Sequence, residues 1–559
     1  MRRPDFRSLW TATLGDGRWI WLLLILPVAL FLPALPIDET RYLGVAWEMR
    51  AHGEFLVPHL NGAAYSDKPP LMFWLINIAW SVFGLNVWSV RLGVLAASLA
   101  TVVMFERLVL RLDADAATAR RASFVLMGML YFALFSSAIM FDVLLTTWVL
   151  VTLHGAVDLD RRRWIRGVVL LSIGVGLGIL TKGPVILLDA AMVIVFGAWW
   201  SDTAQQHKAR WYGCLGLGIL GGAAIGLAWA IPAAISGGPD YSNAIFFHQT
   251  LDRVTKSFAH RRPFWFYFAA APFMVLPWML VMRARWHAWR ESFHISKSIR
   301  FATAWALPAF VAFCLVSGKQ PHYLLPLLGA LAVYLATVVG RENSRVDGLL
   351  FGVVLALAGI GLAALPFIAR SASDGGYFQH FIHHREITGS TVAVFAGLWP
   401  LWGVVTLVLG TGLIFWRRAR MSLRPVALTS AAFAAICGLA LAQMIGPYID
   451  VTTAANRIRQ IQESGKPIAH LAWHHGIFEF AGRLTQPLPA VNFGQLHDWC
   501  VAHPDGTIVS IYTKYPIPVK PELEIPYRFG HISFWRASEI AKVEIRASAN
   551  PEPDEPDDD

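Results

Sequence analysis

Residues 19–36 read WIWLLLILPVALFLPALP, a run without a single charged side chain. Because an α-helix needs about 20 residues to cross the hydrocarbon core of a bilayer, this run is long enough to span a membrane. Arginines precede it at Arg2, Arg3, Arg7 and Arg18. That order resembles a signal peptide, but no small-x-small cleavage site stands before Asp38. We therefore expect an uncleaved anchor helix.

Runs of this kind recur along the whole chain. The 559-residue sequence is 56% hydrophobic with a mean hydropathy of +0.49, which excludes a soluble globular protein. We expect a mainly α, polytopic membrane protein with about thirteen transmembrane helices. Their expected ranges are 19–37, 88–108, 122–140, 143–158, 167–181, 184–200, 212–234, 264–282, 301–317, 322–340, 348–369, 390–416 and 426–445.

The net charge of +10 is explained by where the basic residues lie. Most Lys and Arg residues fall in short connections between apolar runs, the pattern of cytoplasmic loops in membrane proteins, so a nucleic-acid partner is not expected. Such loops are 107–121, 161–166, 207–210, 283–300, 341–345 and 417–424. With an odd number of spans and a cytoplasmic N-terminus, the C-terminal tail lies on the periplasmic side of a bacterial inner membrane.

Three parts follow from this organisation. Residues 1–445 form the transmembrane domain, with long outer loops at 38–87, 236–263 and 370–390. Residues 446–549 alternate strand-like runs (467–471, 506–512, 531–535) with helix-like stretches (453–464, 494–503), which predicts a periplasmic α/β domain. The Pro- and Asp-rich end, 550–559, is expected to be disordered. The four cysteines form neither a disulfide framework nor a metal-type spacing.

The first outer loop holds the most informative motifs. It begins Asp38-Glu39-Thr40-Arg41-Tyr42, directly after the first apolar run, and residues 40–51 then form an amphipathic pattern that Gly53 ends. Such a pattern predicts a helix on the membrane surface. Further on, Tyr65-Ser66-Asp67-Lys68-Pro69-Pro70 opens another apolar segment. The ammonium of Lys68, at the same membrane level as Asp38, suits a lipid phosphate.

These motifs, with Pro58-His59-Leu60-Asn61-Gly62 between them, resemble the first outer loop of ArnT-like and protein O-mannosyltransferase-type glycosyltransferases of the GT-C class. An outer α/β domain after thirteen spans also resembles ArnT, so the likeness covers nearly the whole chain. It implies an inverting glycosyltransferase that takes a sugar from a polyprenyl-phosphate donor at the outer face.

The resemblance also implies roles for individual residues. Those with catalytic roles are Asp38, Glu39 and Asp142. Those that would bind the donor phosphate are Lys68, Lys182 and Arg253. Those that would bind substrate are Arg41, Tyr42, Tyr65, Asp67, His248, His322 and Tyr323. Independently, an unpaired acid in hydrocarbon costs roughly 2.5–3.5 kcal/mol on insertion scales, which favours a paired or functional site for Asp142.

Histidines in the third long loop raise the question of a metal. His380, His383 and His384 have helical i, i+3 and i+4 spacing, so two or three of them could face one divalent cation. The alternative is a solvated loop, and no cofactor is established by the pattern.

The substrate stays open between several alternatives. The leading one is transfer of 4-amino-4-deoxy-L-arabinose to a lipid A phosphate by a monomeric enzyme in contact with membrane lipid. Another is transfer of a mannose-like sugar to protein or to an envelope glycan, because Asp67 and two prolines stand where aminoarabinose transferases usually have Glu-Lys-Pro. A transporter or flippase would also have many spans, but no inverted repeat or pair of broken helices is evident.

Overall fold

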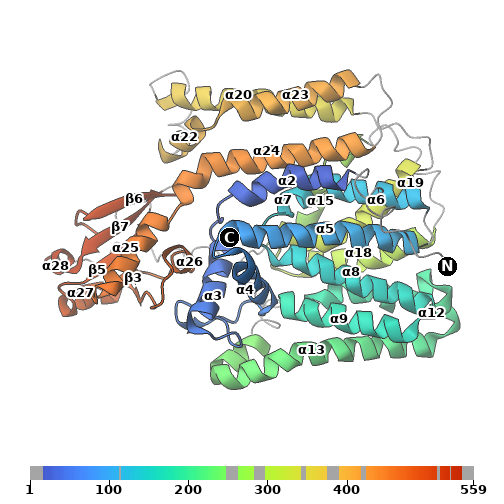
Figure 1. The fold of residues 1–559 in the computed structure, drawn as a ribbon, viewed down its shortest axis with the longest axis horizontal. Helices are drawn as coiled ribbons and strands as arrows, with labels where there is room; N and C mark the ends of the chain where they lie inside the picture. The colour runs from blue at the N-terminus through green and yellow to red at the C-terminus, as the bar shows by residue number, and fades with distance from the viewer. Residues whose placement is uncertain are drawn as a thin grey trace.

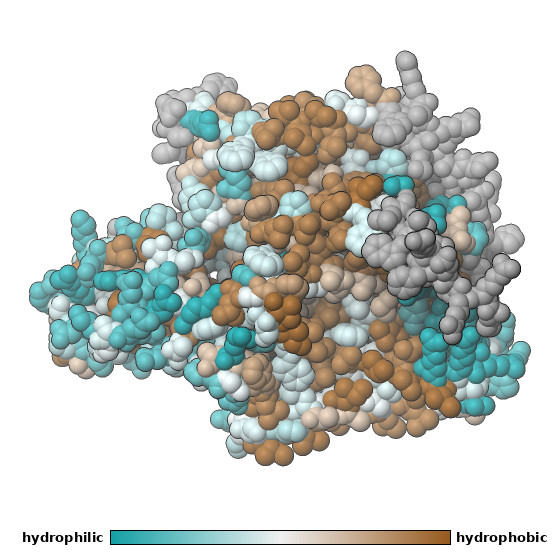
Figure 2. Space-filling model, viewed as in Figure 1, coloured by the Kyte–Doolittle hydropathy of each residue, from teal (hydrophilic) through white to brown (hydrophobic). Residues whose placement is uncertain are grey.

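A bundle of long helices and a smaller α/β unit at one end of it make up the molecule (Figure 1). The computed structural model describes residues 17–112, 115–246, 262–281, 296–340, 348–373, 389–416, 423–512, 517–528 and 530–543. Figure 2 shows apolar side chains across the middle of the molecule and hydrophilic ones over the α/β unit. This distribution suits a bundle surrounded by lipid.

The bundle is built from apolar helices of unequal length. In chain order they are α2 (Arg18–Phe31), α4 (Leu71–Phe83), α5 (Val87–Arg111), α6 (Ala116–Gly128), α7 (Leu130–Phe135), α8 (Phe141–Asp160), α9 (Trp164–Lys182), α10 (Met192–Val195), α11 (Gly197–Trp200), α12 (Asp202–Gln206), α13 (Lys208–Asn243), α15 (Phe266–Met274), α16 (Trp278–Val281), α18 (Lys297–Leu315), α19 (Leu328–Gly340), α20 (Leu349–Ser373), α22 (Gly389–Ala396), α23 (Pro400–Trp416) and α24 (Leu423–Ile449). Seven described helices are long and apolar enough to cross a membrane, and four shorter ones are apolar. The protein is therefore a multi-pass membrane protein, while thirteen spans stays a prediction.

Four expected spans are broken rather than continuous, and one of them, 390–416, divides between α22 and α23. The range 122–140 divides at Met129, which has extended backbone between α6 and α7, and the range 264–282 divides between α15 and α16. The two breaks meet, because the backbone N–H of Leu130 donates to the carbonyl of Leu276 at 2.7 Å. The range 184–200 contains a π-helix, Leu187–Ala191. Hydropathy does not reveal such breaks, since the broken segments are as apolar as the intact ones.

The first outer loop folds into a helix and a short hairpin. Helix α3 (Asp38–His52) covers the predicted range 40–51 and ends at Gly53, whose φ of 70° lies in the left-handed region. Strands β1 (His59–Leu60) and β2 (Ala63–Ala64) then pair antiparallel. The turn between them is Asn61-Gly62, and both residues have positive φ, as a two-residue hairpin turn requires.

The α/β unit holds a five-stranded sheet in the order β4-β3-β5-β7-β6. Its elements are α25 (Thr452–Glu463), β3 (Ile468–Leu471), α26 (Glu479–Gly482), β4 (Ala490–Val491), α27 (Phe493–Ala502), β5 (Thr507–Tyr512), β6 (Leu523–Tyr527), β7 (Gly530–Arg536) and α28 (Ala537–Ile540). Strands β4 and β5 run parallel to β3, whereas β7 is antiparallel to both β5 and β6. The sequence pattern indicated β3, β5 and β7 but not the edge strands. β4 has only two residues, and β6 is largely exposed.

The α/β unit is tied to α3 and the hairpin by specific contacts. Trp47 Nε1 donates to the carbonyl of Leu484 at 2.7 Å. Asn61 donates to the carbonyl of Leu488 at 2.8 Å and accepts from the same residue's N–H at 2.6 Å. The rings of Trp80 and Phe480 stack with centroids 4.8 Å apart. The unit therefore fixes the loop that follows α3.

Beneath this interface lies a buried cluster of acid and imidazole. Glu479 and His474 are 3% and 2% exposed, and Glu479 Oε1 lies 3.5 Å from His474 Nδ1. Burial raises the pKa of Glu479 to about 7. Burial also lowers the pKa of His474 to about 4 and that of the adjacent His470 to about 3. Both histidines are therefore neutral at neutral pH, while Glu479 titrates.

This cluster predicts a pH-dependent stability of the α/β unit. The folded state holds the Glu479 proton up to about pH 7 while the unfolded chain releases it at an ordinary Glu pKa, so stability falls as pH rises. Between pH 6.5 and 8.5 the loss should be about 1 kcal/mol. Hydrogen exchange of β3 amides in the full chain measures it. Glu479→Gln should abolish this dependence and exposed Glu463→Gln should keep it; equal slopes in all three proteins would refute the assignment.

Candidate active site

Asp38 is the first residue of α3 and the more accessible of the two acids there. Its Oδ1 accepts hydrogen bonds from Arg41 Nη2 at 3.2 Å and from Tyr42 Oη at 3.1 Å. The Asp38 side chain is 38% exposed. The ring of Tyr42 is buried and packs edge-on against Phe141, with centroids 4.8 Å apart. Arg41 and Tyr42 thus orient Asp38 through its Oδ1, while part of its carboxylate stays exposed.

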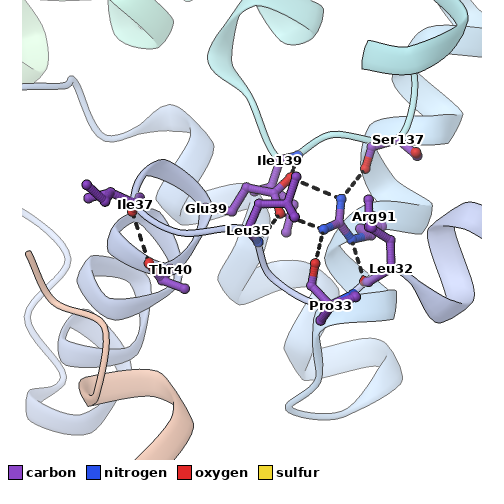
Figure 3. A network of polar contacts seen from close by, with 9 residues as sticks. All are labelled: Leu32, Pro33, Leu35, Ile37, Glu39, Thr40, Arg91, Ser137 and Ile139. Atoms are coloured by element: carbon purple, nitrogen blue, oxygen red, sulfur yellow. Dashed lines mark hydrogen bonds and ion pairs between the residues drawn. The ribbon is translucent and has the colours of Figure 1, made fainter. Parts of the chain in front are cut away.

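Glu39, the next residue, points into the bundle instead. Its Oε1 accepts hydrogen bonds from Arg91 Nη1 at 3.0 Å and from the backbone N–H of Ile139 at 2.8 Å (Figure 3). Its Oε2 accepts hydrogen bonds from Arg91 Nη2 at 2.5 Å and from the backbone N–H of Leu35 at 2.8 Å. Arg91 also donates to the carbonyls of Leu32, Pro33 and Ser137. Both carboxylate oxygens of Glu39 are engaged, so we assign Glu39 to anchoring α3 rather than to the chemistry for which the motif suggested it.

Arg91 was not among the residues that the sequence singled out. It lies in α5, inside the expected span 88–108, and it is 0% exposed. A charged residue within an apolar span is a signal in its own right, because it needs a partner there. That signal would have found Arg91, but not its partner.

Asp142 forms the second acidic centre, in the first turn of α8. Lys182, the last residue of α9, donates to Asp142 Oδ1 at 2.6 Å, and its Nζ lies 4.4 Å from the ring centroid of Tyr323. His322 Nε2 lies 3.9 Å from Asp142 Oδ2. His322 and Tyr323 stand at the start of the 3-10 helix η4 (Pro321–Leu327). Three predicted site residues therefore surround Asp142, which is 2% exposed.

The two acidic centres face one region. The charges that act on His322 come from Asp142, Lys182, Asp38 and Lys68. Lys68 stands just before Pro69-Pro70 and the start of α4, so its backbone is restricted. Residues from α3, α4, α8, α9 and η4 thus converge, although they are up to about 280 positions apart in the sequence.

The aromatic and acidic residues of the loop surround Arg41. Burial lowers the pKa of Arg41, but the neighbouring Tyr65, Asp38, Tyr42 and Asp67 raise it, and the net result is a raised pKa. Arg41 is therefore a permanent cation beside Asp38. The ring of Tyr65 packs against Phe73, with centroids 6.0 Å apart, so the loop between α3 and α4 closes over this side of the site.

Some predicted residues lie outside the described part of the chain. These are His248, Arg253, His380, His383 and His384. Among the residues that the structure describes, no group of three or more His, Cys, Asp or Glu side chains could hold a metal ion. The metal interpretation of the three histidines stays a prediction.

The chain was compared with protein families and with known proteins. Residues 67–230 match the family model of dolichyl-phosphate-mannose-protein mannosyltransferases, a range that contains Lys68, Asp142 and Lys182. A protein of Erwinia tasmaniensis named undecaprenyl phosphate-α-4-amino-4-deoxy-L-arabinose arabinosyl transferase is 28% identical over 433 residues, or 74% of this chain and 72% of its own. A protein of the same name from Pseudomonas aeruginosa is 30% identical over 383 residues, or 65% of this chain and 66% of its own.

The fold agrees over nearly the whole chain. The crystal structure of ArnT from Cupriavidus metallidurans bound to undecaprenyl phosphate superposes with a TM-score of 0.74 at 18% identity, covering 97% of this chain and 100% of that one. The chain is an ArnT-like glycosyltransferase of the GT-C class. This confirms the family and the fold class that the loop motifs indicated.

The architecture of this ArnT-like enzyme suggests a double-mutant test of the buried pair. Arg91→Met should leave Glu39 as an uncompensated buried charge, which typically costs about 3–5 kcal/mol. We expect little monodisperse protein after detergent extraction. Adding Glu39→Gln to Arg91→Met should restore much of the yield, because no buried charge then remains.

The matched control is Arg50→Met, which changes an exposed arginine of α3, the helix that carries Glu39, and should accumulate normally. If Arg91→Met accumulated as well as Arg50→Met, the pair would not be the anchor of α3.

Proposed function

We propose that this enzyme transfers 4-amino-4-deoxy-L-arabinose from an undecaprenyl-phosphate donor to a phosphate of lipid A. The reaction would take place at the periplasmic face of a bacterial inner membrane. The relatives that match most of this chain carry arabinosyl transferase names, and a homologous fold has been crystallised with undecaprenyl phosphate. The single observation that carries the proposal is the convergence of Lys68, Lys182, Asp38 and Asp142 around His322.

The chemistry follows from where charge develops. An acceptor oxygen forms a bond to the anomeric carbon as the bond from that carbon to the donor phosphate oxygen breaks, so the configuration inverts. The leaving phosphate gains negative charge, and preorganised cations stabilise it most when water is excluded. Lys182 is 11% exposed and already oriented by Asp142, and Lys68 stands just before α4, which packs against α9. These two lysines are the proposed phosphate ligands among the described residues.

The role of Asp38 depends on the acceptor. A phosphate of lipid A is already ionised near neutral pH and needs only orientation, whereas a hydroxyl needs a general base during attack. The open side of Asp38 suits contact with the acceptor or with the sugar. Asp142 is engaged by Lys182, so its proposed role is to aim that lysine.

A second candidate has an observation in its favour. The matched family model is that of protein mannosyltransferases, and it covers the segment with both lysines. Transfer of a hexose to protein or to an envelope glycan would use the same donor chemistry. Mass spectrometry of lipid A and of envelope glycans, with and without the gene, distinguishes the two. Loss of aminoarabinose from lipid A supports the proposal, and an unchanged lipid A with altered glycans supports the alternative.

Asp38→Asn should lower transfer of labelled sugar by at least about 100-fold, the usual range for a lost acid–base or orienting carboxylate. Because Asp38 is more than a third exposed, the variant should fold and insert normally. The measurement uses purified enzyme with polyprenyl-phosphate donor. Exposed Glu54→Gln in the same outer loop is the control. Full activity of Asp38→Asn would remove Asp38 from the mechanism.

Lys68→Ala should lower turnover at saturating donor as well as donor affinity, because a cation on the leaving phosphate acts more strongly in the transition state than in the ground state. Lys68→Arg keeps the charge but changes a compact ammonium to a planar fork, so partial activity is expected. Steady-state kinetics over a range of donor concentrations separate the two effects. A normal turnover number with only a raised KM would reduce Lys68 to a binding residue.

A further inference from the structure

The chain after Lys182 leaves regular helix geometry. Helix α9 ends at Lys182, Gly183 takes a φ of 77°, and the π-helix Leu187–Ala191 follows before α10. A π-helical turn is rare, and such turns frequently occur at functional sites. This one packs against α8 and α18. It therefore forms the wall of the bundle next to Asp142 and Lys182.

Asp189 is the acid at the centre of that turn. It is 1% exposed, and neither of its carboxylate oxygens has a hydrogen-bond partner among the residues that the structure describes. Among the described residues, the charges that act on Asp189 are Lys182 of α9 and Asp142 of α8; helices α10 and α18 contribute none. Asp189 thus lies near the donor-site ion pair without being bonded to either member.

The protonation state follows from this environment. An isolated carboxylate without hydrogen bonds in a medium of low dielectric constant is so costly that the group takes up a proton instead. Lys182 does not remove that cost, because its ammonium already donates to Asp142 at 2.6 Å. A neutral carboxyl of Asp189 therefore fits this environment better than a carboxylate does.

We propose that Asp189 is a positioning residue of the donor site, a neutral carboxylic acid beside the Lys182–Asp142 pair that leaves Lys182 available to the donor phosphate. The inference rests on the proposed function of Lys182. With Asp189 neutral, Lys182 and Asp142 sum to zero charge, so an incoming phosphate meets no net repulsion from this group. With Asp189 ionised, the group would be negative, and two carboxylates would compete with the phosphate for one ammonium.

The kinetic test compares Asp189→Asn with the wild-type enzyme over a range of pH. Asparagine keeps the shape and stays neutral, so turnover at neutral pH should remain within about threefold. The wild-type enzyme should lose turnover on the alkaline side as Asp189 ionises, and the variant should lose it at least about one pH unit higher. Asp202→Asn, an exposed acid of α12, should follow the wild-type profile. Superimposed profiles, or a folded but inactive Asp189→Asn, would overturn the proposal.

An infrared measurement tests the protonation state without any substrate. A protonated carboxyl without hydrogen bonds absorbs at a carbonyl frequency well separated from that of carboxylates. The wild-type protein should show this band, Asp202→Asn should keep it, and Asp189→Asn should lose it. An unchanged band in Asp189→Asn would overturn the assignment. Because this readout needs no transfer, absence of transfer by the wild-type enzyme would contradict the proposed function and leave the test of Asp189 intact.

Discussion

The ion pair between Glu39 and Arg91 is the constraint on which the rest of the site depends. It joins the end of the first span, the start of α3, helix α5 and the segment before α8, all within a region closed to water. A buried pair of this kind is weak evidence for stability as such, since desolvation offsets most of the attraction. Its effect here is geometric. Glu39 holds the first turn of α3 in the bundle, and so Asp38, one residue earlier, is held at the surface.

The far side of α3 is fixed by different means. Trp47 and the Asn61 turn bond to the α/β unit, so the loop that leads to Lys68 is held between the bundle and that unit. Both the helical bundle and the α/β unit therefore hold the segments that form the site. The α/β unit contacts the segment that leads to Lys68, although the proposed site residues in the described part of the chain all lie within the first 323 residues.

Arg41 and Lys182 each lie beside an acid or an aromatic ring. These partners fix the direction of each cation and keep it charged. Asp142 aims Lys182, Asp38 lies beside Arg41, and Tyr323 offers its ring face to the Lys182 ammonium. An anionic donor can replace one of these partners without bringing a bare charge into the bundle. Asp189, which has no hydrogen-bond partner among the described residues, is proposed to be neutral for a related reason, since a bare charge is costly in the bundle. Site residues in a membrane enzyme thus need their counter-charges in place before the substrate arrives.

The sequence by itself determined the membrane class, the helical fold and the family, because apolar length and a contiguous loop motif are local properties. It also indicated Asp38, Lys68, Asp142 and Lys182, since charged residues at the ends of apolar runs are visible without a structure. Only the tertiary structure decided which acid is buried and which is open. Glu39 and Asp38 are neighbours in one motif, yet the helical turn of α3 points one toward Arg91 and leaves the other open. The breaks in α6–α7 and α15–α16 and the short edge strand β4 were equally beyond local patterns, because each depends on a hydrogen-bond partner in another segment of the chain.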